Sequence, residues 1–548
     1  MSTPEKATRR MDEQEKRDLA VIRQPGPTRF KRATRVDMPA AIRSHDEEGR
    51  PRKQSDVLLD IGRQHTLFHG DDGTAYALVD RAVYAVESSA YRETLAKEFL
   101  NLTNKGANRN SMADAVTTLA AIAKHRGDRR RVWLRTASAD GGIVIDAGHD
   151  DRRMIEVSAA GWTWVDQGPM FRRTPGTQAL PEPGSPDFGL LWKYVNVAEE
   201  HRALVAAWML AAFRPSGPYP ILFLSGEQGT GKSTAARVLR RLIDPSSSLL
   251  RTPPKEVRDL LVGALNGWIL ALDNLSFLGP QLSDALCRIS TGGAISERAL
   301  YTNTDEILIE VQRPVIVNGI EELATRPDLV ERGLHIELEV IDGRMPEAAF
   351  WRAFESDAPR IFGALIAGLS TAIRDHESID IGRLPRMADF AQWAAAGIGA
   401  LGFTAAEFMS AYRDNLDTGM TAGVDSSPVG RALTTFMLAR LEWCGTASEL
   451  LSALTSVASG AENTQAWPRT PRGLSGALRR LAPALRRQGI EIRTERGADR
   501  SRARLIRLCS SPEQPSAPSE PSATKPPLDD ADGMDGCPPP LHEVEIEL

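Results

Sequence analysis

The stretch from Ile221 to Thr234 limits the possible folds of this chain more than any other, because it joins three local patterns in a fixed order. Four apolar residues, Ile221 to Leu224, predict a buried strand that runs straight into G-x-x-x-x-G-K-S. Glycines there let backbone N–H groups wrap phosphates, and the helix that follows offers its positive N-terminal end. Strand, loop and helix in this order predict a site for a nucleoside triphosphate.

The residues of this loop have separate tasks. Lys232 is expected to neutralise phosphate charge, and Ser233 to supply an oxygen ligand to Mg²⁺. The predicted cofactors are therefore ATP and Mg²⁺. The residues expected to bind the nucleotide are Gly226, Glu227, Gln228, Gly229, Thr230, Gly231, Lys232, Ser233 and Thr234.

Composition narrows the class of protein. The chain has 548 residues, of which 42% are hydrophobic and 25% charged, which is typical of a soluble globular protein of three or four domains. Its 4 cysteines are widely spaced, so we expect neither zinc nor disulfides, and a reducing cytoplasm. The most apolar run, 203–213, is too short to span a bilayer, and no signal peptide is visible. We therefore expect a cytoplasmic protein that does not bind membranes.

Two further apolar segments end in polar residues. Residues 268–272 lead to Asp273, 41 residues after Lys232, and 314–317 lead to Asn318, 45 residues further on. A carboxylate at a strand end orders Mg²⁺ together with the loop serine, so Ser233 and Asp273 are the predicted metal residues. Asn318 would orient the attacking water and sense the γ-phosphate; the alternative is an asparagine that caps its strand.

These motifs resemble those of superfamily 3 helicases and the related primase-helicase ATPases of phages, plasmids and large DNA viruses, which are relatives of AAA+ proteins. The resemblance covers roughly residues 195–345. Its most particular part is 286–301, which is similar to the family's Gly-Gly turn and hairpin that lines the central channel of the ring. The resemblance implies ATP hydrolysis, a homo-oligomeric, hexamer-like ring and DNA contact by Arg298, the only basic residue of that hairpin.

The chain departs from the family pattern at two places. Many AAA+ proteins have a second acidic residue after the strand-end aspartate, and here that position is Asn274. An amide cannot accept a proton from the attacking water, so Asn274 is also compatible with slow ATP hydrolysis. The family's Gly-Gly-Asp is Gly292, Gly293 and Ala294 in this chain.

The segment from Thr325 to Arg332 resembles the part of AAA+ proteins that presents an arginine to a neighbour's γ-phosphate. The resemblance implies catalytic roles for Arg332 and Arg326 between subunits. Arg332 is the stronger candidate because it directly precedes a strand. The alternative is that both arginines pair with Asp328, Glu322 or solvent.

Around this core, patterning predicts an α/β protein of several parts. Asp146, His149, Asp150 and Asp151 could suggest a metal site for nucleotide polymerisation, but their setting favours a solvated turn. The expected parts are a disordered charged arm (1–54), a small α+β domain (55–180), the ATPase core (190–345), a helical lid (346–420), a winged helix (429–509) and a disordered acidic, proline-rich tail (510–548).

Arginine is concentrated in the predicted winged helix. Residues 469–507 contain 12 arginines and 3 acidic residues, a formal charge of +9. Such clustering is typical of a protein that binds a phosphate backbone; the alternative is a surface composition typical of a GC-rich genome. The expected DNA contacts here are Arg479, Arg480, Arg486, Arg487, Arg493, Arg502 and Arg504.

Taken together, the patterns predict an ATP-dependent DNA helicase or translocase that acts in replication of a phage or other mobile element. One alternative is a DNA-bound switch that binds ATP, assembles and hydrolyses slowly. Another is a P-loop kinase that acts on a small molecule.

Overall fold

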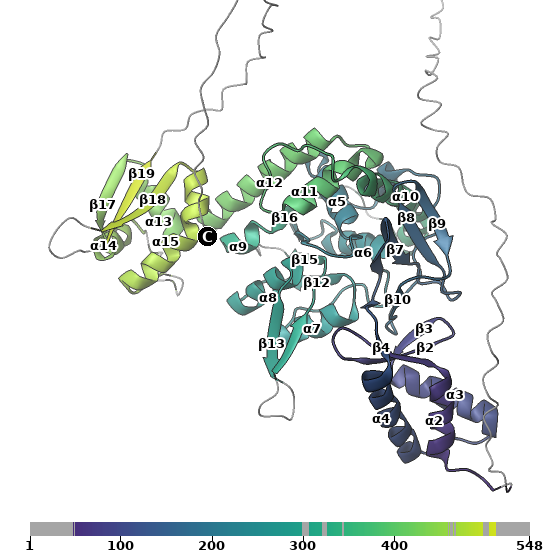
Figure 1. The fold of residues 1–548 in the computed structure, drawn as a ribbon. Coiled ribbons are helices and arrows are strands. Elements are labelled where there is room, and N and C mark those ends of the chain that lie inside the picture. The colour runs from purple at the N-terminus through teal and green to yellow at the C-terminus, as the bar shows by residue number, and fades with distance from the viewer. Residues whose placement is uncertain are drawn as a thin grey trace, which may run out of the picture.

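The computed structural model describes residues 48, 50–298, 306–319, 326–341, 343, 345–458, 460, 464, 467–496 and 504–510. Nearly all of the predicted arm and tail therefore lie outside the described residues, as does Arg502. The described chain is a mixed α/β protein with a central body, a group of helices at its N-terminal end and a C-terminal lobe that shares a hydrophobic cluster with the central sheet (Figure 1). No helix in these ranges combines the length and apolar character needed to cross a membrane.

A parallel sheet forms the middle of the molecule, with strand order β12-β15-β11-β16. Its strands are almost continuously apolar, which suits a sheet that is covered on both faces. Because all four strands are parallel, their carboxyl ends share one edge. The strands are β11 (Ile221–Ser225), β12 (Leu270–Leu275), β15 (Val315–Gly319) and β16 (Gly333–Glu337), and the nearby helices are α6 (Lys232–Ile243), α7 (Val257–Asn266), α8 (Pro280–Thr291) and α9 (Pro327–Val330).

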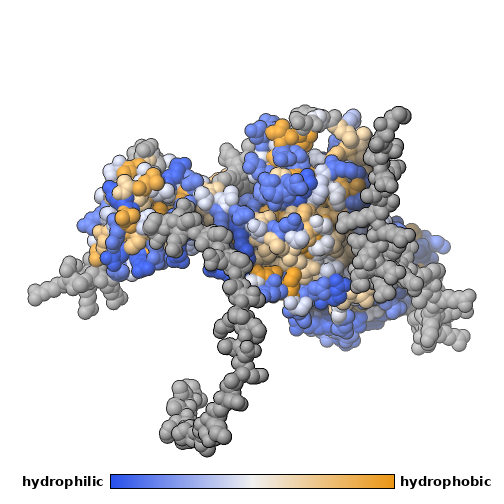
Figure 2. All heavy atoms as spheres, turned by 90° about the horizontal axis from the view of Figure 1, so that it is seen from above, coloured by the Kyte–Doolittle hydropathy of each residue, from blue (hydrophilic) through white to orange (hydrophobic). Residues whose placement is uncertain are grey.

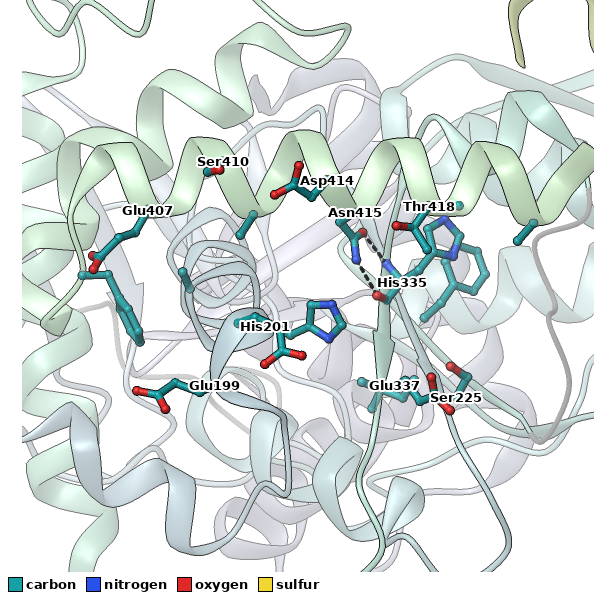
Figure 3. A pocket seen from close by; sticks show the side chains of 18 residues that line it. Glu199, His201, Ser225, His335, Glu337, Glu407, Ser410, Asp414, Asn415 and Thr418 are labelled. Carbon is teal, nitrogen blue, oxygen red and sulfur yellow. Dashed lines mark hydrogen bonds between the residues drawn. The ribbon is translucent and has the colours of Figure 1, made fainter. Parts of the chain in front are cut away.

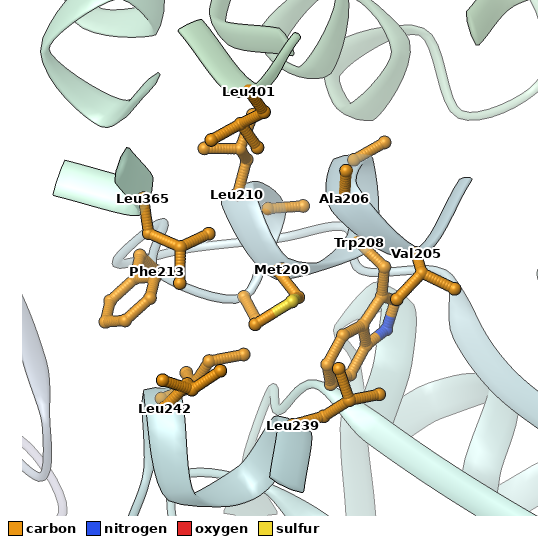
Figure 4. Packing of buried hydrophobic residues seen from close by; sticks show 14 of the residues in the cluster. Val205, Ala206, Trp208, Met209, Leu210, Phe213, Leu239, Leu242, Leu365 and Leu401 are labelled. Atoms are coloured by element: carbon orange, nitrogen blue, oxygen red, sulfur yellow. The ribbon is translucent and has the colours of Figure 1, made fainter. Parts of the chain in front are cut away.

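Helix α5 (Glu199–Ala211) is the centre of the largest hydrophobic core. From Ala203 to its end it is buried on every side, as expected of a helix that is apolar all round. Trp208 and Met209 point toward Leu239 and Leu242 of α6 (Figure 4), and the indole N–H of Trp208 donates to the Pro220 carbonyl at 2.9 Å. Truncating such a side chain typically costs about 3–5 kcal/mol, so α5 holds the core together.

The segment predicted as a helical lid covers the other side of α5. It contains α10 (Glu347–Asp375), α11 (Ala388–Gly397), a 3₁₀ turn η2 (Ile398–Leu401) and α12 (Ala405–Ser426). Thr404 and Glu407 form a reciprocal cap at the start of α12, with Glu407 N donating to Thr404 Oγ1 at 3.1 Å. Helix α12 then continues away from the core and leads into the C-terminal lobe (Figure 1).

The region predicted as one domain, 55–180, contributes to two large hydrophobic cores and to two small clusters. The first is formed by three helices and a sheet of order β3-β2-β1-β4. Its elements are α2 (Gln54–Gln64), α3 (Ser89–Thr103), α4 (Arg109–Arg126), β1 (Thr66–His69), β2 (Ala75–Val79), β3 (Ala82–Ala85) and β4 (Asp128–Arg129). Two short strands, β5 (Val132–Trp133) and β10 (Met170–Phe171), pair beside it.

A second sheet, of order β6-β7-β8-β9, belongs to the central body instead. Ile143, Ile145 and Ile155 are buried in the same core as α5 and α10, because no helix within 55–180 covers this apolar face. Ser370 of α10 donates to the Ser158 carbonyl at 2.7 Å. The strands are β6 (Thr136–Ala139), β7 (Gly142–Asp146), β8 (Met154–Ser158) and β9 (Gly161–Val165).

The expected solvated turn around Asp146 is wrong for that residue. Asp146 is only 2% exposed, and both its oxygens accept from Arg173, at 2.8 and 2.6 Å. Gly148 N donates to the same carboxylate at 3.1 Å. These contacts hold the pKa of Asp146 below its ordinary value although burial acts to raise it. The carboxylate is a structural ion pair, which still agrees with rejecting a polymerase metal site.

A buried arginine ties the second sheet to the central one. Arg135, 1% exposed, donates to Asp244 Oδ1 at 3.1 Å, just after α6. Asp244 Oδ2 in turn accepts from the backbone N–H groups of Trp268 and Ile269, each at 3.1 Å, where β12 begins. Removing one partner of such a buried pair typically costs about 3–5 kcal/mol.

The C-terminal lobe consists of three helices and an antiparallel sheet of order β17-β19-β18. The cap predicted for α14 is confirmed, since Glu449 N donates to Thr446 Oγ1 at 3.3 Å and Thr446 N to Glu449 Oε2 at 2.7 Å. Strand β17 was not predicted. The elements are α13 (Pro428–Met437), β17 (Glu442–Thr446), α14 (Ala447–Val457), α15 (Pro471–Arg487), β18 (Ile490–Arg496) and β19 (Arg504–Ser510).

Hydrophobic residues reach the surface in several separate areas among hydrophilic ones (Figure 2). The strongly exposed examples include Phe277 after β12, Val340 after β16 and Leu438 in the C-terminal lobe. Scattered exposed apolar residues are normal on folded proteins.

Candidate nucleotide site and nucleic-acid interface

The glycine-rich loop leaves β11 at the carboxyl edge of the central sheet. Gly226, Gly229 and Gly231 have φ of 134°, 93° and 82°, which L side chains rarely adopt. A Cβ on Gly226 would also lie 2.8 Å from the Leu338 carbonyl oxygen. Helix α6 begins directly after Gly231, which provides no side-chain cap. The first N–H groups of α6 are therefore directed at the loop, where an anion would bind them.

Lys232 is the charged group of this loop. Its Nζ donates to the carbonyl oxygens of Gly226 and Glu227, both at 2.7 Å. Partial burial lowers the pKa of Lys232 from its ordinary value. Phosphate oxygens would replace these carbonyls as acceptors and favour the charged amine.

Ser233 and Asp273 meet at this edge, as the sequence predicts for a shared metal. Ser233 Oγ donates to Asp273 Oδ1 at 2.8 Å, and Asp273 N donates to the Arg251 carbonyl at 2.9 Å. Mg²⁺ binds through one or two protein oxygens, phosphates and waters rather than in an all-protein cage. Within the described ranges, no cluster of three or more His, Cys, Asp or Glu side chains could hold a metal alone. The donor set therefore fits Mg²⁺ that is bound together with phosphate.

Asn318 lies between these two groups, because β15 separates β11 from β12. It is 1% exposed, and its Oδ1 accepts from Asn274 N at 2.6 Å. Its Nδ2 is buried without a hydrogen-bond partner. An unsatisfied buried donor typically costs about 1–3 kcal/mol. Strand capping explains Oδ1 only, whereas a phosphate oxygen or a water would satisfy Nδ2.

Asn274 has a backbone property that the sequence did not reveal. Its φ is 56°, in the left-handed region that asparagine tolerates better than most residues. Its side chain is exposed, while its N–H is held by Asn318. The conformation gives one physical reason for an asparagine at this position.

Arg326 and Arg332 both make contacts within their own chain. Arg326 donates to Asp284 Oδ1 at 2.6 Å, and Arg332 pairs with Asp328. The Arg332 carbonyl accepts from Ile221 N at 2.8 Å, so Arg332 lies at the amino end of β11. Five strand residues, roughly 16 Å, separate it from the loop of its own chain. A role across a subunit interface stays a prediction. Of the ion pairs in the alternative, Arg332 with Asp328 is present, while Arg326 pairs with Asp284 instead and Glu322 lies outside the described residues.

The predicted hairpin after the Gly-Gly turn is confirmed at the level of the backbone. Strands β13 (Ala294–Arg298) and β14 (Glu306–Glu310) pair antiparallel and project from the central body (Figure 1). The tip, 299–305, and the side chain of Arg298 lie outside the description. DNA contact by Arg298 stays a prediction.

The arginines of the C-terminal lobe differ in their surroundings. Arg479, Arg480 and Arg486 are exposed on α15, and none of them forms an ion pair with another residue that the structure describes. Arg487 pairs with Asp417 of α12 at 2.6 Å, and Arg493 with Glu491 at 2.8 Å. Arg504 is exposed on β19. Among the predicted contacts that the structure describes in this lobe, DNA would have to compete with a carboxylate for Arg487 and Arg493.

A large cavity, about 650 Å³, was not predicted (Figure 3). It lies between the start of α5, the ends of β11 and β16, and α12. Asn415 closes the free edge of β16, since its Oδ1 accepts from His335 N at 2.9 Å and its Nδ2 donates to His335 O at 2.6 Å. His335 stacks on Phe223, and burial lowers its pKa to about 4. The carboxylates that line the cavity, Glu199, Glu200, Glu337, Glu407 and Asp414, make it unsuited to phosphate.

Fold and site together define an α/β protein with a phosphate-binding loop at the carboxyl edge of a parallel sheet. Residues 188–421 match the family model of the actinomycete integrative conjugative element replication protein, and residues 429–522 match that of the AICE RepA C-terminal domain. Both matches are to replication proteins of integrative conjugative elements. The prediction of a replication protein of a mobile element is thereby confirmed.

The remaining comparisons are distant. No curated protein matches the chain significantly. The A form apo structure of the NrS-1 C terminal region is 13% identical, with a TM-score of 0.38, and the match covers 83% of this chain and 98% of that chain. A second apo structure of that region, 305–718, is 12% identical, with a TM-score of 0.34 and the same coverage. Similarity at this level supports no conclusion about activity.

Proposed function

We propose that this chain is an ATP-hydrolysing enzyme of the superfamily 3 helicase type that moves along or unwinds DNA during replication of a mobile element. The observation that carries the proposal is the contact of Ser233 Oγ with Asp273 Oδ1, 2.8 Å, beside the unpartnered Nδ2 of Asn318. All three groups lie at the edge where the loop opens. This arrangement suits a triphosphate with its metal and an attacking water.

The residues present would divide the work as follows. The loop N–H groups and Lys232 would hold the phosphates, and Ser233 and Asp273 would hold Mg²⁺, which neutralises phosphate charge when bound. Asn318 would orient the attacking water or a γ-phosphate oxygen. Ile341, 42% exposed, lies beside the loop, with its Cδ1 3.0 Å from where a Gly231 Cβ would be. It offers an apolar contact to the base.

In a ring of subunits, an arginine of one subunit would add a positive charge beside the γ-phosphate bound by its neighbour. Because Arg332 lies at the opposite end of β11 from the loop, it could reach a phosphate only in a neighbouring subunit. There it would exchange Asp328 for developing phosphate charge. Arg326, held by Asp284 beside the start of α8, is the second candidate.

The C-terminal lobe would bind DNA as a winged helix. Its order α13-β17-α14-α15-β18-β19, with three strands in one antiparallel sheet, is the order of that fold. Arg479 and Arg486 are seven residues apart, so they lie on nearly the same face of α15. Exposed guanidinium groups without carboxylate partners suit phosphate contacts.

Asn274 favours a second candidate function, a DNA-bound switch that hydrolyses ATP slowly. Replacing Asn274 by Asp supplies a carboxylate and keeps a residue that tolerates the left-handed backbone. If the amide limits hydrolysis, Asn274→Asp should raise the rate of ATP turnover. A lower rate in a folded variant would mean that the amide itself orients the water.

The experiment that separates motor from switch is steady-state ATP turnover with and without single-stranded DNA. The proposed enzyme should hydrolyse ATP in a Mg²⁺-dependent reaction that single-stranded DNA stimulates several-fold. Slow turnover that DNA leaves unchanged would favour the switch.

A further inference from the structure

A second cavity, about 390 Å³, lies where the two N-terminal sheets approach each other. Arg81 comes from the turn between β2 and β3, and Arg152 from the turn between β7 and β8. Arg173, which follows β10, and the 166–170 loop complete the wall, and Val83, Met154 and Phe171 supply apolar surface. The cavity therefore combines cationic and apolar groups from segments that are distant in sequence.

The charges that line this cavity do not balance. Arg173 is bound by both oxygens of Asp146, and Arg81 lies 4.0 Å from Asp166. Arg81 also donates to the Asp151 carbonyl at 2.7 Å, which joins the two sheets. Arg152 makes no side-chain hydrogen bond or ion pair with any residue that the structure describes. Asp146 and Asp150 attract its charge without contacting it directly. The lining residues therefore carry three guanidinium groups but only two carboxylates.

The backbone of Arg152 has a strained, left-handed conformation. Its φ is 60° and that of Arg81 is 67°, in a region that L residues other than asparagine and aspartate rarely adopt. Arg152 is also partly buried, and burial together with the nearby Arg173 lowers its pKa. Strain of this kind concentrates at functional sites, and a partly buried guanidinium without a direct hydrogen-bond partner has donors free to bind an anion. A bound anion would accept hydrogen bonds from the Arg152 guanidinium and balance its charge.

We propose that this cavity binds the phosphate group of a nucleotide through Arg152, with the base on the apolar wall. Arginine is well suited to phosphate because its guanidinium is always charged and presents a planar fork of donors. The volume lies within the ordinary range of small-ligand pockets and accommodates one nucleotide. The ligand is either a free nucleotide or one nucleotide of a single DNA strand.

The test is calorimetric titration of the full chain that carries Lys232→Ala, so that the glycine-rich loop cannot contribute. Thymidine monophosphate should bind in a saturable manner, whereas thymidine should not. Adding Arg152→Gly should reduce the affinity at least tenfold. Adding Arg129→Ala instead removes an exposed arginine that pairs with Asp71 on the first sheet, and it should change nothing.

Thermal unfolding distinguishes a ligand-binding arginine from a structural one. Glycine accepts a φ of 60° without strain, so Arg152→Gly should fold and raise the melting temperature of the ligand-free chain. A lower melting temperature, unchanged affinity for thymidine monophosphate, or no saturable binding in the Lys232→Ala chain would overturn the proposal.

Competition identifies the source of the nucleotide. If the site takes part of a DNA strand, a ten-residue oligothymidylate should displace labelled thymidine monophosphate at concentrations at least tenfold lower than unlabelled mononucleotide does. Better displacement by the mononucleotide would assign a free nucleotide. Either outcome supports a nucleotide site in this cavity. The test does not depend on ATP turnover, because the chain carries Lys232→Ala.

Discussion

The phosphate edge of the central sheet and the arginine face of the C-terminal lobe are both suited to phosphate, but they are built differently. At the sheet edge, a few groups have fixed partners, such as Ser233 with Asp273 and Asn274 with Asn318. On α15, several arginines are exposed and largely independent of one another. Loss of a single side chain at the sheet edge should therefore abolish ATP turnover, whereas loss of a single arginine on α15 should only reduce the affinity for DNA.

Lys232→Ala should break the sheet-edge site with the largest effect. Loss of the loop's cation should reduce ATP turnover by roughly 10²–10³-fold or more, since removing one preorganised stabilising donor has effects of that size. Turnover and nucleotide affinity are the measurements. Arg237→Ala is a matched control, because Arg237 is on the same helix and pairs with Glu347 instead. Wild-type turnover in Lys232→Ala would end the triphosphate assignment.

Asp273→Asn separates the metal from the nucleotide. The amide oxygen can still accept from Ser233 Oγ, so the fold and metal-free ATP binding should persist. Mg²⁺-dependent turnover should fall by roughly 10²-fold, because the metal loses its charged protein ligand. Titrating Mg²⁺ against turnover checks this. An unchanged Mg²⁺ dependence would show that Asp273 is not the metal residue.

Mixing two inactive variants tests whether Arg332 acts on the nucleotide site of a neighbouring subunit. In random rings of Arg332→Ala and Lys232→Ala chains, about a quarter of interfaces combine an intact lysine with an intact arginine. Turnover should therefore return in part on mixing, relative to either variant alone. If the chains co-assemble and no activity returns, Arg332 is a partner of Asp328 and nothing more.

The arginine face should respond by degrees. Replacing Arg479 and Arg480 together should weaken duplex binding for all sequences alike, because phosphate contacts position a protein without specifying sequence. Each lost contact should flatten the slope of log affinity against log salt by about 0.9. Arg487→Ala should have a smaller effect, because Asp417 already neutralises that arginine. If the wild-type chain, the double variant and Arg487→Ala all show the same salt dependence, these arginines do not contact DNA and only reflect the composition of the surface.

The sequence predicted which residues meet at the carboxyl edge of the central sheet, because the signals for their positions are local. A strand, its terminal residue and the loop that follows are contiguous, and parallel strands bring their carboxyl ends together. The orphaned Nδ2 of Asn318 and the φ of Asn274 could not be predicted, since both depend on packing between strands 44 residues apart.

Long-range packing explains the remaining differences. The consecutive apolar residues 143–145 of β7 predict a buried strand, but nothing local shows that α10, some 200 residues later, covers this sheet. Asp146 resembles a turn residue until Arg173 is placed beside it. The acidic cavity was missed for the same reason, as its walls come from α5, β16 and α12.

The central claim, ATP hydrolysis coupled to movement on DNA, is tested most directly by strand displacement from a forked duplex. The account predicts that the wild-type chain releases the labelled strand only with ATP and Mg²⁺, and that Lys232→Ala releases none. Rapid ATP turnover without displacement of any forked substrate, whichever strand carries the overhang, would contradict it.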